Sequence, residues 1–331
     1  MIKVAKPDIR EEDIEAAAAV IRSGWTTGGE KVAELEEALQ PWMGGEVVVC
    51  SSATAGLHMA LLACQHKMSS LIVPAFTWVA TANVVEMTCG RVQFCDVDPV
   101  TYNAATYADI PVALFGRPTE IFGWIVDSAC ALGAEPLPKD DLRCQVVSFH
   151  PRKPCSSGEG GAVATTDAKL ARKLRALRNH GMIDGRLLMP GLNYRMTDIQ
   201  AALLIGQVKR YDETLKRRRE VAATYLSELA DVSWLRLPQW HDQHVWQSFV
   251  CRVKQGCDRR MIMLHLANDG VETTVGTQCV PRLEYYRGKY GFEDGDFPVA
   301  EALADDTLSL PVHSRMTDSD LSAVIEAVKA I

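Results

Sequence analysis

The sequence predicts an α/β protein with a mostly parallel central sheet flanked by helices, followed by a smaller α+β domain. Short apolar runs alternate with helical patterns between residues 46 and 178, as in sheets whose parallel strands are joined by helices. A long amphipathic pattern then runs from Thr197 to about Ala230, and the tail beyond it mixes strand and helix signals. At 331 residues the chain is long enough for two domains. We place them at 1–208 and 209–331, joined by the long helix.

Composition argues against several classes of protein. A net charge of −7 speaks against a broad nucleic-acid surface, and no apolar run has the length of a signal peptide or a membrane span. The ten cysteines contain no C-x-x-C pair, which favours reduced thiols over disulfides or a zinc site. We therefore expect a cytoplasmic protein that binds no nucleic acid, no membrane and no metal.

The expected helices begin and end at ordinary signals. Glu11 to Ser23 carries apolar residues at helical spacing, and Gly24 ends the pattern. A second amphipathic helix is expected from Lys31 to Trp42, and Thr197 is a suitable N-cap for the long helix. Further helices are expected at Ala55–His66, Thr77–Met87, Ala168–Arg178, Arg259–Asp269 and from about Asp318.

Strands are expected where short apolar runs lie between turn residues. These runs are Val47–Val49, Leu71–Val73, Val92–Phe94, Val112–Phe115, Trp124–Asp127, Gln145–Ser148, Gly161–Thr165 and Phe249–Val253. The connection from Phe115 to Trp124 is too short for the crossover helix that parallel neighbours need, so we expect a turn there. Asn179–Tyr194 and Thr277–Phe297 are rich in loop-forming residues and predict irregular segments.

Polar residues follow three of the predicted strands, at Ser52, Asp127 and Ser148. Ligands of open α/β sheets bind at the carboxyl ends of the strands, so these residues mark a candidate site. The turn Cys50–Thr54 also precedes a helix, and its N–H groups would suit a phosphate. An ordinary N-cap by Ser52 or Thr54 explains the same residues.

Lys153 lies on a tight connector between two of the expected strands. Such a lysine is either an exposed surface cation or a nucleophilic amine that forms a Schiff base. With Asp127, the phosphate-type turn and Trp78, it completes the set that pyridoxal 5′-phosphate (PLP) requires. The amine would take the aldehyde and the carboxylate the ring nitrogen, while the indole would cover the ring and the turn would bind the phosphate.

Motifs along nearly the whole chain resemble one family. Ser148-Phe149-His150 with Lys153, followed by Gly158-Glu159-Gly160-Gly161, resembles the lysine motif of the DegT/DnrJ/EryC1/StrS sugar aminotransferases, which are PLP enzymes of fold type I. Other matching segments are Ser23–Gly28, Ser52–Ala55, Pro74–Thr81, Asp127–Gly133, Gly191–Asp198 and Leu308–Pro311. The lysine motif combined with the Asn193-Tyr194-Arg195-Met196 segment is highly specific.

The resemblance implies a role for each matching position. Lys153 would bind the cofactor as a Schiff base and move protons, and Asp127 would pair with the ring nitrogen. Trp78 would stack on the ring, with Cys130 beside it. The cofactor phosphate would be bound by Ala53, Thr54 and Ser148. Asn193 would reach the cofactor of the neighbouring subunit, so the resemblance also implies a homodimer with shared active sites.

Two positions and one segment depart from the family pattern. Ala53 stands where the family has Gly, so the phosphate turn must avoid a positive φ at this residue. Cys130 stands where the family has Gln, which removes an amide from beside the ring. The segment Thr277–Tyr286 lacks a histidine that many members carry.

The resemblance implies a PLP-dependent aminotransferase that moves an amino group, from glutamate, to a keto group of a nucleotide-linked sugar. One alternative is a sugar 3-dehydratase of the same fold, although that subfamily has histidine where this chain has Lys153. Another is a non-catalytic member, which Ala53, Cys130 and the short connection from Phe115 to Trp124 would suit. A nicotinamide-dependent reductase does not fit, because the sequence contains no G-x-G-x-x-G.

Overall fold

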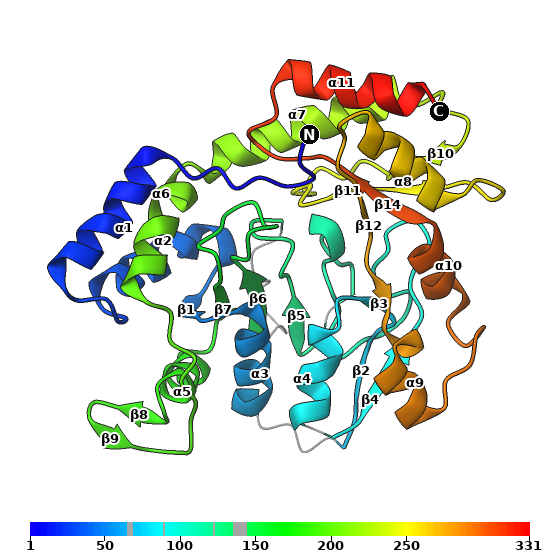
Figure 1. Cartoon of the computed structure of the whole chain (residues 1–331). Helices are drawn as coiled ribbons and strands as arrows, with labels where there is room; N and C mark the ends of the chain where they lie inside the picture. The colour runs from blue at the N-terminus through cyan, green and yellow to red at the C-terminus, as the bar shows by residue number, and fades with distance from the viewer. Residues whose placement is uncertain (65–68, 89, 122, 135–143) are drawn as a thin grey trace.

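The computed structural model describes residues 1–64, 69–88, 90–121, 123–134 and 144–331 (Figure 1). Its central sheet has the order β1 (Glu46–Cys50), β7 (Gly161–Thr165), β6 (Cys144–Ser148) and β5 (Ile125–Asp127). β5 and β6 are parallel, whereas β7 runs antiparallel to both β1 and β6. The α/β class is therefore confirmed, with a mixed sheet in which β7 is the reversed strand.

The backbone at residues 109–113 continues this sheet beyond β5. Val112 forms a parallel bridge with Asp127, and the N–H groups of Asp109 and Ile110 donate to the Ile72 carbonyl at 2.9 and 3.2 Å. Ile72 belongs to β2 (Leu71–Pro74), which pairs in parallel with β4 (Val92–Cys95). The backbone thus links the four-stranded sheet to the β2–β4 pair.

The prediction of a strand at Val112–Phe115 is wrong. After Val112 the chain turns into a short 3-10 helix, η1 (Leu114–Gly116). Phe115 has φ 58° and Gly116 has φ 97°, values that turn the chain out of the extended conformation a strand needs. In the described part of the connection to β5 this turn replaces a crossover helix, as the short length predicted.

The helices of the described residues are α1 (Glu11–Ser23), α2 (Glu30–Met43), α3 (Ala53–Cys64), α4 (Ala80–Thr88), α5 (Ala168–Arg178), α6 (Asp198–Lys209), α7 (Tyr211–Glu228), α8 (Arg259–Asn268), α9 (Glu284–Tyr290), α10 (Pro298–Asp306) and α11 (Asp318–Lys329). The predictions for α1, α2, α5 and α8 are confirmed to within a residue at either end, and α11 begins at Asp318 as predicted. α3 begins two residues earlier than predicted, and its predicted end at His66 lies outside the described residues. Cys89 also lies outside the described residues. None of the described helices is long and apolar enough to cross a bilayer.

Two helix predictions need correction. α4 begins at Ala80 because Phe76–Thr77 forms a short strand, β3, that pairs with β13 (Gln278–Cys279). The single long helix breaks at Arg210, which has φ −108° and ψ 22° and separates α6 from α7. Thr197 does cap α6: its side chain accepts the Gln200 N–H, and the Gln200 side chain accepts the Thr197 N–H.

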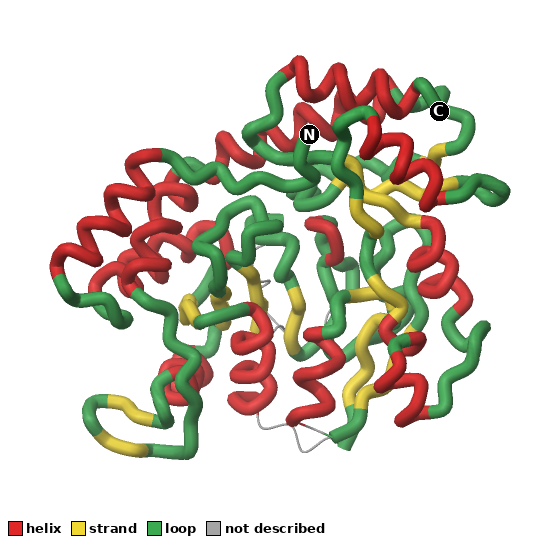
Figure 2. The backbone as a smooth tube through the Cα atoms, viewed as in Figure 1, coloured by secondary structure: helices red, strands yellow, loops and turns green. Residues whose placement is uncertain are grey.

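Alternate strand residues enter different hydrophobic cores, as expected when consecutive side chains point to opposite faces. In β1, Val47 and Val49 pack in the core that includes α2 and α6. Val48 and Cys50 pack in the core that includes α3, α4 and α5. Figure 2 shows the strands between these helices. Because both faces are covered, β1 is apolar along most of its length.

The C-terminal residues form a second sheet with its own core. Its strand order is β10 (Leu235–Arg236), β11 (Phe249–Val253), β14 (Thr307–Leu310) and β12 (Thr274–Val275). Residues of α7, α8 and α11 pack on these strands, and both chain ends lie in this region (Figure 1). Ile2 forms a bridge with Val271, so the first residues join this part. The division at 208/209 stays a prediction.

The two predicted irregular segments contain regular elements. Residues 179–194 include a projecting hairpin of β8 (Met182–Ile183) and β9 (Arg186–Leu187), at the lower left of Figure 1. Residues 277–297 include α9, whose Tyr286 is buried in the core beside α3 and α4. Both elements are short, which is why the composition of these segments resembled that of loops.

Gly161, the first residue of β7, lets α3 approach the sheet. It pairs with Cys50 on one side and with Ser148 on the other. A Cβ atom at Gly161 would lie 2.5 Å from the Ala53 nitrogen and 2.5 Å from the Ser52 carbonyl carbon. These are backbone atoms, so they cannot move aside as a flexible side chain would.

Gly161→Ala should therefore lower the free energy of unfolding by about 1–3 kcal/mol through overpacking. Urea unfolding measures this change. Gly288→Ala on α9 is the matched control, because a Cβ there meets no atom within 4 Å. Alanine is more favourable than glycine inside a helix by up to about 1 kcal/mol, so this variant should not be destabilised. Equal effects at the two positions would contradict the close packing at Gly161.

Candidate active site

Three strand ends meet at the same edge of the central sheet. Asp127 is the last residue of β5, Ser148 is the last residue of β6, and Ser52 follows β1. Gly161 pairs with both Cys50 and Ser148, which places the turns after β1 and β6 on either side of β7. The clustering of polar residues at the strand ends is confirmed.

Asp127 is a buried carboxyl group, with 5% of its surface exposed. One oxygen accepts the Thr81 hydroxyl at 2.7 Å, and the other accepts the Ala129 N–H at 3.0 Å. Burial raises the pKa of Asp127, while the Thr81 and Ala129 hydrogen bonds and the charge of Lys153 act in the opposite direction. A further cationic or N–H partner would therefore stabilise the ionised form of Asp127.

Lys153 lies half-buried in the turn after β6, and its N–H donates to the His150 carbonyl at 2.8 Å. Its side-chain nitrogen Nζ is 3.0 Å from Cys130 Sγ. Cys130 lies in the turn that follows β5 and Asp127. The structure thus brings Lys153, Cys130 and Asp127 together, and the interpretation of Lys153 as a freely exposed surface cation does not fit.

The turn after β1 has the geometry of a helix N-terminus. Ser52 caps α3, because its hydroxyl accepts the Ala55 N–H at 3.1 Å. Ala53 is the first residue of α3 and has no positive φ, as its side chain requires. Thr54 is exposed, and Ser148 is half-buried with its hydroxyl accepting the His150 N–H at 3.3 Å. The N-cap interpretation holds, and it leaves the helix end available to an anion.

Trp78 and Asn193 lie at the surface. Trp78 is 61% exposed, and its carbonyl accepts the N–H of Thr81. Thr81 is also the residue whose hydroxyl donates to Asp127. Asn193 is exposed, and its backbone bridges Asn179. Both are therefore accessible to a ligand or to another chain.

Two residues that the sequence did not single out support the site. Thr81 binds Asp127, and it stood in a matching motif without a role of its own. Gln247 is buried, and its Nε2 donates to the Arg152 carbonyl at 2.9 Å, one residue before Lys153. No local pattern marks Gln247, because its partner is far away in the sequence.

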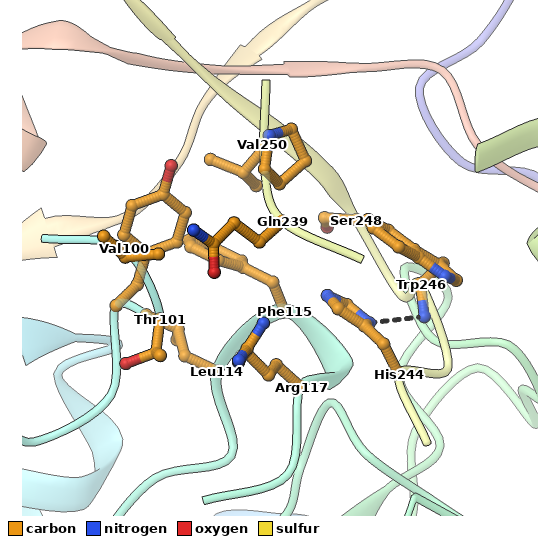
Figure 3. A pocket seen from close by; sticks show the side chains of 12 residues that line it. Val100, Thr101, Leu114, Phe115, Arg117, Gln239, His244, Trp246, Ser248 and Val250 are labelled. Carbon is orange, nitrogen blue, oxygen red and sulfur yellow. Dashed lines mark hydrogen bonds between the residues drawn. The ribbon is translucent and has the colours of Figure 1, made fainter. Parts of the chain in front are cut away.

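Gln247 lies between Trp246 and Ser248, two residues that line a small hollow (Figure 3). Tyr102, Phe115 and Trp246 all have positive φ values and line one small hollow. The His244 ring stacks on the Trp246 ring with 3.9 Å between centroids, and His244 Nδ1 accepts the backbone N–H of Trp246 at 2.9 Å. The hollow has a volume of about 10 Å³, about enough for one water molecule, so it is too small for a substrate.

The residues present fit PLP. The raised pKa of Asp127 reflects a buried carboxyl that a protonated ring nitrogen would stabilise. The amine of Lys153 lies nearby for the aldehyde, and the α3 N-terminus with Ser148 offers N–H and hydroxyl donors for a phosphate. An amine, a buried acid and an anion-binding helix end converge on one edge of the sheet.

Comparisons with known proteins agree with this chemistry. The model of the DegT/DnrJ/EryC1/StrS aminotransferase family matches residues 7–114 and 123–329. The chain is 32% identical over 375 aligned positions to the uncharacterised protein MJ1066 of Methanocaldococcus jannaschii, covering 98% of this chain and 96% of that protein.

Solved structures share the whole fold. Spr1654 from Streptococcus pneumoniae, named as a candidate sugar aminotransferase and solved in its PMP form, has a TM-score of 0.91 and 25% identity, with 99% of this chain and 97% of that one covered. DesV of S. venezuelae, in complex with a ketimine intermediate, has a TM-score of 0.88 and 25% identity, with coverage of 100% and 98%. The chain therefore belongs to the DegT/DnrJ/EryC1/StrS aminotransferase family, whose members are PLP-dependent sugar aminotransferases.

Proposed function

We propose that this enzyme transfers an amino group from glutamate to a keto group of a nucleotide-linked sugar, with Lys153 binding the cofactor as a Schiff base. The observation that carries the proposal is the contact between the Lys153 amine and Cys130. Cys130 lies in the turn that directly follows the buried Asp127. Cys50, Cys155 and Cys251 are thiols in the structure, which supports the cytoplasm as the compartment.

Bound PLP supplies an electron sink for the substrate carbon whose proton is removed. Lys153 would be the base and the acid: its free amine would remove a proton from one carbon of the reacting centre and return a proton to another carbon. The turn that carries Lys153 is fixed by the His150 carbonyl and by Gln247 bound to Arg152. A fixed turn limits the positions the amine can reach and so favours a directed proton transfer.

Asp127 keeps the ring nitrogen of the cofactor protonated in this proposal. Thr81 and Ala129 orient its two oxygens and favour the ionised form. Ser148, Thr54 and the N–H of Ala53 would bind the cofactor phosphate.

We also propose a homodimer in which Asn193 serves the partner's cofactor. Large apolar side chains are exposed on the β8–β9 hairpin, with Leu187 70% and Leu188 54% exposed, and on α1, where Ile21 is 57% exposed. A hollow of about 340 Å³ that includes Arg178 and Met182 in its lining opens beside the hairpin. Exposed apolar surface of this kind is typical of a protein interface, and a second copy of the chain would cover it.

Lys153→Ala should abolish the covalently bound cofactor and lower turnover by at least about 10²–10⁴-fold, because base and anchor are lost together. Absorbance of the purified protein and of its borohydride-reduced peptides checks the anchor. Single turnover with glutamate, then with a panel of nucleotide-linked keto sugars, checks the reaction.

A deoxy sugar in place of an amino sugar would favour the dehydratase. Bound PLP without half-transamination by any amino donor would favour the non-catalytic alternative.

Thr81→Val should destabilise the cofactor-free protein more at neutral than at acidic pH. Removing the hydroxyl raises the pKa of Asp127 further, and a folded-state pKa above the unfolded value costs stability once the pH exceeds the unfolded pKa. The expected loss near neutrality is about 1.5–3 kcal/mol, as for a hydrogen bond to a buried charge. Urea unfolding at several pH values measures it. Thr81→Ser keeps the hydroxyl and should show no such pH dependence; if both variants behave alike, Thr81 does not act through Asp127.

Mixing the Lys153→Ala and Asn193→Ala subunits should recover activity if the sites are shared. The heterodimer then holds one site in which both residues are wild type. Subunits are mixed after mild dissociation, and turnover is compared with that of each parent. Lys153→Ala mixed with Asp127→Asn is the control, since these residues belong to the same subunit's site and no intact site can form. No recovery beyond this control would contradict the role of Asn193.

A further inference from the structure

The contact between Lys153 and Cys130 joins two nucleophilic side chains from separate turns. Nζ of Lys153 and Sγ of Cys130 are 3.0 Å apart. The Lys153 turn is held by the His150 carbonyl, and the Cys130 turn is closed by the Ala131 N–H bound to the Ser128 carbonyl at 2.8 Å. Both turns follow paired strands of the sheet, β6 and β5. The two atoms are therefore held within reach of each other by the fold.

Cys130 differs from the buried cysteines of the chain. Cys50 and Cys155 are fully enclosed, and burial raises the pKa of each thiol to about 12. Such thiols are shielded from oxidants and remain protonated. Cys130 is half-buried, at a site that must admit a substrate. Its neighbour is an amine that can react with an oxidised sulfur.

We propose that Cys130 and Lys153 form a reversible covalent sulfur–nitrogen bond when a peroxide oxidises the site, and that this bond switches the enzyme off. The peroxide oxidises the thiol to a sulfenic acid and is itself reduced to water. The Lys153 amine then attacks the sulfur, the S–O bond breaks, and a second water leaves with the amine proton. Two hydrogens are lost from the protein in total, and the sulfur is the atom oxidised.

The bond is reversed by thiols. One small thiol attacks the sulfur and releases the Lys153 amine with a proton, leaving a mixed disulfide at Cys130. A second thiol molecule displaces Cys130 and forms the small-molecule disulfide. The oxidising equivalents of the peroxide thus end in that disulfide, and the original side chains are restored.

The consequence for activity rests on the proposed function of Lys153. A lysine bonded to Cys130 cannot bind the cofactor aldehyde or move a proton. A lysine already bonded to the cofactor cannot react with the oxidised sulfur. The switch therefore acts on the cofactor-free protein and on the stage of the reaction at which Lys153 is free, and bound PLP protects against it.

The test treats the cofactor-free protein with hydrogen peroxide and measures intact mass and digested peptides. The expected product has lost two hydrogens, and fragment ions join Cys130 to Lys153. Dithiothreitol restores the original mass. Cys130→Ala and Lys153→Arg should each fail to form the bond, whereas Cys257→Ala, which changes an exposed thiol elsewhere, should form it as the wild type does. Stable sulfenic or sulfinic acid at Cys130, or a disulfide from Cys130 to another cysteine, would overturn the proposal.

A second measurement separates this proposal from the proposed function. The oxidised and the reduced proteins are each mixed with PLP, and the absorbance of the bound cofactor is followed. Loss of cofactor binding on oxidation and its return with dithiothreitol are expected. If the bond forms but reduced protein does not bind PLP through Lys153, the proposed function fails and the crosslink stands. If reduced protein binds PLP normally and peroxide leaves both mass and binding unchanged, the crosslink proposal fails alone.

Discussion

The backbone contact between Gly161 and the first turn of α3 is the constraint on which the site depends. β7 lies between β1 and β6, and its first residue pairs with Cys50 and Ser148 at once. With no side chain at Gly161, the Ser52–Ala53 backbone packs directly against it. The N-terminus of α3 and the end of β6 are therefore fixed on either side of one residue, and the Lys153 turn follows directly from β6.

The second requirement is electrostatic. Asp127 is buried at the end of β5, and burial raises its pKa. An ionised carboxyl group buried in such a place costs stability, and partners for the charged form offset part of this cost. Thr81 and Ala129 provide two of these partners. A protonated ring nitrogen would provide a third, which links the binding of the cofactor to the stability of the folded protein.

The C-terminal region is coupled to the lysine turn through one buried segment. Arg218 on α7 donates to the Trp246 and Val312 carbonyls at 2.8 and 3.0 Å, and burial lowers its pKa to about 10. Gln247, next to Trp246, in turn binds the Arg152 carbonyl. A guanidinium in the C-terminal core thus orients the segment that holds the turn before Lys153, so the two parts of the chain together position the amine.

The sequence by itself determined the α/β class, most helices, and the placing of Ser52, Asp127 and Ser148 at strand ends, because apolar periodicity and turn residues are local signals. Its motifs also identified the family. Tertiary structure decided what depends on distant partners: the strand-like Val112–Phe115 run turns at Phe115 and Gly116, and the long helix breaks at Arg210. The contacts Thr81–Asp127, Gln247–Arg152 and Cys130–Lys153 exist only once remote turns are brought together. No spacing within one segment could reveal them.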